Sequence, residues 1–75
     1  MIRINEESWE IILDFGEEEE YMEIHDDLME YVENLVGFDN IDSYEDDKYW
    51  ISCRNECHCD ELYDLISDKI DRLVD

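Results

Sequence analysis

The feature that most constrains this chain of 75 residues is a long acidic span that contains no cation. Between Arg3 and Lys48 lie eighteen Asp and Glu residues and not one Lys or Arg, and the whole chain has a formal net charge of −20. Burying an unpaired charge costs more than a small domain can offset. Any fold of this chain must therefore turn these carboxylates towards water.

The composition nevertheless indicates a folded protein. Hydrophobic residues make up 44% of the chain and aromatic residues 12%, which is too rich for an intrinsically disordered sequence. No apolar run approaches the roughly 18 residues that span a bilayer, and the N-terminus lacks the pattern of a signal peptide. We expect one soluble, cytoplasmic domain over residues 1–75, with no membrane association.

Residues 8–15, SWEIILDF, alternate between apolar and polar positions, which is typical of a half-buried strand. Trp9, Ile11, Leu13 and Phe15 fall on its apolar side. The preceding Ile2 and Ile4 form either a short partner strand, turned by residues 5–8, or an extended lead-in.

An amphipathic helix is predicted up to Val36, with Gly37 as its C-terminal stop. Glu17 to Glu20 precede or occupy its first turn, where the helix dipole favours anions. One half of the helical wheel holds Tyr21, Met22, Ile24, His25, Leu28, Met29, Tyr31, Val32, Leu35 and Val36. The other half holds Glu23, Asp26, Asp27, Glu30, Glu33 and Asn34.

Residues 38–54 predict a hairpin with a turn at residues 45–48, and the last segment predicts a second amphipathic helix with Cys59, Leu62, Ile66 and Ile70 on its apolar arc. Asp68 and Arg72 are spaced to pair on that helix. The order strand, helix, hairpin, helix predicts an α+β fold, in which a small antiparallel or mixed sheet carries two amphipathic helices on one face.

If the helices lie side by side, their acidic arcs merge into one anionic surface. Such a surface repels nucleic acids and anionic membranes and attracts basic proteins. Its carboxylate spacing approximates the phosphate array of a nucleic acid. The residues expected to bind a partner are Glu17, Glu18, Glu19, Glu20, Glu23, Asp26, Asp27, Glu30, Glu33, Asp46 and Asp47.

The chain resembles the small acidic DNA-mimicking inhibitors of bacteriophages, which include anti-CRISPR and anti-restriction proteins. The resemblance is one of size and composition over the whole chain, carried by these acidic positions and by no diagnostic motif. It implies a non-enzymatic inhibitor that occludes the cationic DNA- or RNA-binding groove of a bacterial defence complex, such as a CRISPR effector or a restriction enzyme, in the host cytoplasm. It implies no cofactor and no direct binding of nucleic acid.

Other interpretations of the acidity stay open. An immunity protein or antitoxin that caps a basic nuclease or toxin needs the same kind of surface. Adaptation to high salt also produces acidic proteins, whose function then lies elsewhere. Leftover apolar surface would allow a homodimer.

Cys53, Cys57, His58 and Cys59 are four metal-binding residue types within seven positions. Their C-x3-C-x-C spacing matches no common zinc pattern, and Cys53 and Cys59 fall on apolar faces where small core residues are expected. We therefore expect reduced thiols and no metal site.

Catalytic residues are not expected either. His25 lies in the middle of the apolar half of the first helix, and the adjacent Asp26 and Asp27 point about 100° apart on the solvated half. The acidic residues 39–47 lack the glycine and the terminal glutamate of an EF-hand calcium loop. The sequence thus favours a binding protein over an enzyme.

Overall fold

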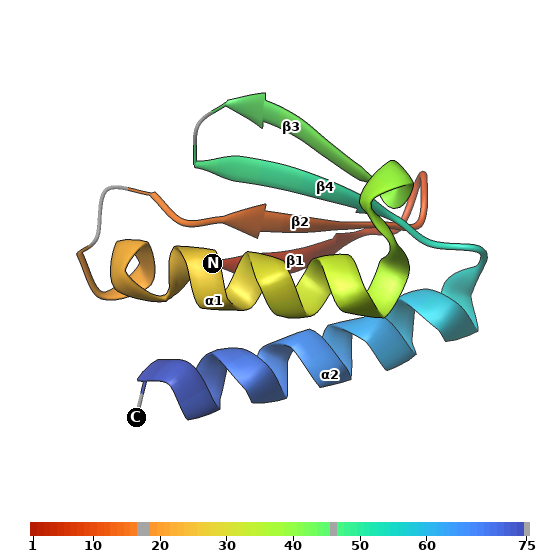
Figure 1. The fold of residues 1–75 in the computed structure, drawn as a ribbon. Coiled ribbons are helices and arrows are strands. Elements are labelled where there is room, and N and C mark those ends of the chain that lie inside the picture. Colours follow the sequence, from red (N-terminus) through yellow and green to blue (C-terminus); the bar gives the residue numbers. More distant parts are fainter. Residues whose placement is uncertain (17–18, 46, 75) are drawn as a thin grey trace.

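The computed structural model describes residues 1–16, 19–45 and 47–74, in which two hairpins alternate with two helices (Figure 1). The strands are β1 (Ile2–Asn5), β2 (Glu10–Asp14), β3 (Ile41–Glu45) and β4 (Lys48–Ser52). The helices are α1 (Glu19–Val36) and α2 (Glu56–Val74), and a short 3-10 helix, η1 (Phe38–Asn40), follows α1. The predicted α+β class is confirmed.

The four strands form one antiparallel sheet with the order β1-β2-β4-β3. Ile2 and Ile4 lie in β1, opposite Leu13 and Ile11 of β2. The N-terminal segment is therefore a partner strand and not a lead-in. The pairing of β2 with β4 joins the two hairpins, although α1 separates them in the sequence.

One face of the sheet and the apolar stripes of both helices form the core. Ile11, Leu13 and Ile51 point to this face at alternate positions of their strands and are fully buried. Helices α1 and α2 lie side by side against this face (Figure 1). They contribute Ile24, Leu28, Met29, Val32, Cys59, Leu62, Ile66 and Ile70 to the core. Because α1 must present its apolar stripe to the sheet, its acidic half points to water.

The other face of the sheet carries a different row of side chains. Arg3, Ile12, Trp50 and Asp42 are register neighbours across β1, β2, β4 and β3. Lys48 lies on the same face, opposite Asp14. Two of the five cations of the chain are thus on the side of the sheet that faces away from the helices.

Two sequence-based boundaries are wrong. Strand β2 begins at Glu10, because Trp9 has a left-handed φ of 52° and closes the β1–β2 turn. Phe38–Asn40 forms the 3-10 helix η1 and not the start of a strand. In both places apolar residues continue the strand pattern while the backbone is turning, so periodicity alone could not locate the turn.

The packing of α1 on the sheet predicts a large difference between two leucines. Leu28 is fully buried and Leu65 on α2 is 39% exposed. We expect Leu28→Ala to lower the free energy of unfolding by about 2 to 5 kcal/mol and Leu65→Ala by about 0.5 kcal/mol. Urea denaturation monitored by circular dichroism measures both. Equal losses would contradict the placement of α1.

Candidate partner-binding surface

The outer face of α1 carries a row of carboxylates that we call the acidic column: Glu19, Glu23, Asp26, Glu30 and Glu33. Successive members are four or three residues apart, so they lie on one side of the helix. All five side chains are exposed, as are Glu20 and Asp27 beside them. Helix α1 contains no Lys or Arg. The column is therefore not neutralised from within its own helix.

The charge density of this face is close to that of a nucleic-acid strand. Seven carboxylates lie between Glu19 and Glu33, a distance of about 21 Å along the helix axis at about 1.5 Å per residue. This corresponds to one charge per about 3.5 Å, compared with about 3.4 Å per phosphate along one strand of B-DNA. A protein groove built for a phosphate strand thus meets a similar linear charge density on α1.

The acidic arcs of the two helices were predicted to merge, and the structure places a cation at their boundary. Lys69 of α2 lies over the Tyr31 ring of α1, with its Nζ 5.4 Å from the ring centroid, so a cation occupies the seam between the helices. Arg72 follows Lys69 by three residues and lies on the same side of α2. It pairs with Asp68 at 3.1 Å, and this predicted i,i+4 pair is confirmed. A cation therefore interrupts the predicted acidic surface at the seam.

Three acidic residues of α2 form a second acidic stripe on the side of that helix opposite Lys69. At 100° per residue, Asp60, Asp64 and Asp71 are about 140° to 180° around the helix axis from Lys69. The column and this stripe are on different helices, and the contact of Lys69 with Tyr31 lies between those helices.

The start of β4 lies at the same end of the molecule as the N-terminus of α1 (Figure 1). Asp47 is half-buried, and its carbonyl oxygen accepts a hydrogen bond from the backbone N–H of Phe15 at 2.9 Å. Phe15 precedes the start of α1 by four residues, so Asp47 is at the same end of the molecule as Glu19 and Glu20. Glu17, Glu18 and Asp46, which were also predicted to bind the partner, lie outside the described residues.

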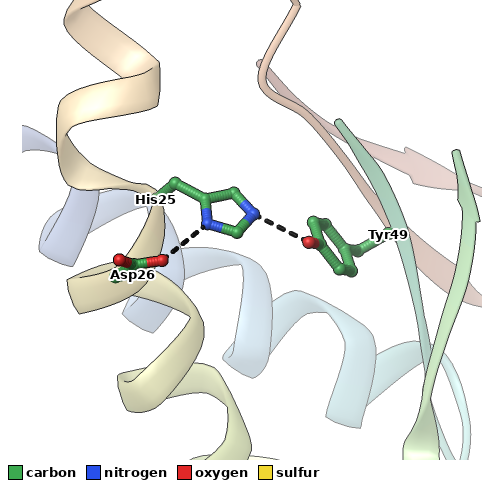
Figure 2. Close-up of polar contacts among 3 residues, drawn as sticks. All are labelled: His25, Asp26 and Tyr49. Carbon is green, nitrogen blue, oxygen red and sulfur yellow. Dashed lines mark hydrogen bonds and ion pairs between the residues drawn. The ribbon is translucent and has the colours of Figure 1, made fainter. Parts of the chain in front are cut away.

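One member of the column is linked to the sheet through a histidine (Figure 2). His25 Nδ1 lies 3.1 Å from Asp26 Oδ1, and His25 Nε2 lies 2.7 Å from the Tyr49 hydroxyl on β4. A carboxylate only accepts hydrogen bonds, so in the neutral ring Nδ1 donates to Asp26 and Nε2 accepts from Tyr49. Asp26 is thereby held in place by a side chain that is itself fixed by the sheet.

Aromatic packing holds this histidine. The Phe15 and His25 ring centroids are 4.7 Å apart, and Phe15 meets Tyr49 edge-on at 5.9 Å. Such tilted and edge-on arrangements are favourable for aromatic pairs. His25 is half-buried, as its place on the apolar half of the helix predicted. Its partner Tyr49 could not be inferred from the sequence, because the two residues are distant in the chain.

The segment that contains the three cysteines forms the N-terminal end of α2 and the residues just before it. Asn55 accepts a hydrogen bond from the His58 backbone N–H at 2.9 Å, which is the N-cap interaction of the helix. His58 Nδ1 accepts a hydrogen bond from the Arg54 backbone N–H at 3.0 Å. Asn is a preferred N-cap residue, so this signal was present in the sequence but was not recognised.

The three cysteines differ in exposure. Cys57 is exposed, Cys59 is buried and Cys53 is half-buried. Within residues 1–16, 19–45 and 47–74, no three His, Cys, Asp or Glu side chains converge where a metal ion could be held. The pKa of the Cys53 thiol is raised from 9.0 to about 12. Burial is the largest cause, and the neighbouring Cys59 thiol and the Glu10 carboxylate contribute to the same shift.

Comparison of the chain with protein-family models, with curated proteins and with solved structures finds no match in any of the three. Among the described residues, neither helix combines the length and the apolar character of a bilayer-spanning segment.

Neutralising part of the column should stabilise the fold. In the column variant, Glu23→Gln, Glu30→Gln and Glu33→Gln together, like-charge neighbours at i,i+3 and i,i+4 are removed. We expect a higher Tm than that of the wild type, with a difference that shrinks as salt is raised, because the repulsion is screened. Thermal melts at about 20 mM and 500 mM NaCl measure this difference in Tm, because the screening of charges changes strongly between these concentrations. An increase that does not depend on salt would contradict the electrostatic explanation.

The Cys53 environment predicts a pH dependence at alkaline pH. The folded state keeps the proton up to about pH 12, whereas a thiol of ordinary pKa loses it near 9.0 in the unfolded chain. The free energy of unfolding should therefore fall as pH rises from 9.0 to about 12. Cys53→Ala should show a shallower fall when urea midpoints of the two proteins are compared across this range. Parallel curves would contradict the shifted pKa.

Proposed function

We propose that this protein is a non-enzymatic inhibitor that occupies the cationic nucleic-acid-binding groove of a partner protein, with the outer face of α1 as its contact surface. Bacterial defence complexes that bind DNA or RNA are the class of partner implied by the resemblance of this chain to the DNA-mimicking inhibitors of bacteriophages. The proposal includes no catalytic step and no cofactor.

One observation carries this proposal: seven carboxylates on a single helix, at the linear charge density of a phosphate strand, with no cation in that helix. Arg and Lys side chains that bind phosphates also bind carboxylates well. Because the array is mounted on a packed helix, binding requires little ordering of the inhibitor, which favours affinity.

The location of the cations supports the same face. Lys69 and Arg72 lie at the seam or beside it, and Arg3 and Lys48 lie on the far face of the sheet. Arg54 lines a pocket with Val36 and Asn40, at the C-terminal end of α1. A partner that approaches α1 from outside therefore meets carboxylates first. Long-range attraction should accelerate its association at low salt.

The second acidic stripe offers a matched control for the test. The stripe variant, Asp60→Asn, Asp64→Asn and Asp71→Asn together, removes three carboxylates from α2, and the column variant removes three from α1. Each change brings the formal net charge from −20 to −17. Net charge alone predicts equal effects, whereas the proposal predicts that only the column variant loses binding.

We expect the immobilised wild-type protein to retain a DNA- or RNA-binding protein from a bacterial lysate at low salt and to release it as salt rises. With the purified partner and fluorescently labelled DNA or RNA, added inhibitor should displace the nucleic acid. The column variant should be at least ten-fold weaker than the stripe variant in this competition, which corresponds to about 1.4 kcal/mol.

Two outcomes would contradict the proposal. Equal weakening of the two variants would remove α1 as the contact surface. Neutralisation of a toxin without displacement of nucleic acid would instead favour the immunity or antitoxin role.

A further inference from the structure

An aromatic side chain is displayed at the C-terminal end of the acidic column. Phe38 of η1 is 74% exposed, more than the other exposed large hydrophobic residues, Met22 at 49% and Leu65 at 39%. Water-exposed aromatic rings are unfavourable in themselves and become favourable when a partner covers them.

The backbone that presents Phe38 is closely hydrogen-bonded. The Gly37 N–H donates to the Glu33 carbonyl at 2.9 Å, and the Asn40 N–H donates to the Gly37 carbonyl at 3.2 Å. Asn40 Nδ2 also donates to the Val36 carbonyl at 2.7 Å. Gly37 has a φ of 87°, which a residue with a Cβ rarely adopts. The ring is thus carried by an ordered turn and binding costs little backbone entropy.

Carboxylates flank this turn in the chain. Glu33 is the last member of the column and Asp39 is the next residue after Phe38; both are exposed. Among the cations, Arg54 lines a pocket of about 150 Å³ together with Asn40 of η1. Two carboxylates against one guanidinium leave the neighbourhood of Phe38 negative, so a cationic group is the ligand that fits it.

We propose that the Phe38 turn is a subsite for a guanidinium group, and that the partner surface facing α1 is therefore rich in arginine rather than lysine. This inference rests on the proposed function and specifies the chemistry of the partner. A guanidinium is planar and weakly hydrated, so it can stack on the Phe38 ring while its N–H groups donate to a carboxylate of Glu33 or Asp39. An ammonium group is more strongly hydrated and gains less from the ring.

The test uses nona-arginine and nona-lysine peptides, which carry the same number of charged side chains. Isothermal titration calorimetry at one low salt concentration gives the ratio of their affinities for the wild type, Phe38→Leu and Met22→Leu. We expect Phe38→Leu to weaken nona-arginine by about two- to five-fold, the range of an exposed cation–π contact, and to change nona-lysine less. Met22→Leu, an exposed site on α1, should leave the ratio unchanged.

A ratio that is unchanged in Phe38→Leu, or that falls equally in Met22→Leu, would overturn the subsite. The double variant Glu23→Gln and Glu30→Gln separates this result from the proposed function, because it leaves Glu33 and Asp39 in place and should weaken both peptides by the same factor. If it does so while Phe38→Leu has no effect, the subsite is wrong and the electrostatic role of α1 stands. If it weakens neither peptide, the proposed function itself is contradicted. Thermal melts of each variant confirm that the fold is intact.

Discussion

The structure depends on the burial of a single apolar layer between the sheet and the two helices. A chain of 75 residues can form only one such core, and the fully buried Ile11, Leu13, Leu28 and Val32 show where it lies. Helix α1 must turn its apolar stripe into this layer. Its seven carboxylates are consequently held together on the outside, at the cost of mutual repulsion. The hydrophobic effect thus creates the anionic surface that we connect with function.

The few cations do not relieve this repulsion where it is greatest. Lys69 lies over Tyr31 at the helix seam, Arg72 pairs with Asp68 on α2, and Arg3 lies on the far face of the sheet. The negative charge of the protein is therefore unevenly distributed as well as large, and it is densest on α1. A partner with a cationic groove would supply the positive charges that are absent from this helix.

Much of the fold was predictable because its signals are local. The alternation in β2 and the 3.6-residue period of α1 appear directly in the sequence, and the α+β class follows from their order. Trp9 and Phe38 were misplaced, because turns interrupt a pattern that the side chains continue. The cation at the boundary of the two acidic arcs was not predicted, since a helical wheel does not show which side of α2 faces its neighbour.

The sequence by itself determined that one helix has an apolar half and a polar half that is acidic apart from one asparagine, because that division needs only the order of residues and the helical period. Only the tertiary structure decided what borders that acidic half: Tyr49 holding His25 and Asp26, Lys69 closing the seam and Phe38 exposed at the end of the column. These features arise where segments distant in the chain pack together, or where the chain turns away from the core. The geometry of packing sets them, and no local pattern encodes it.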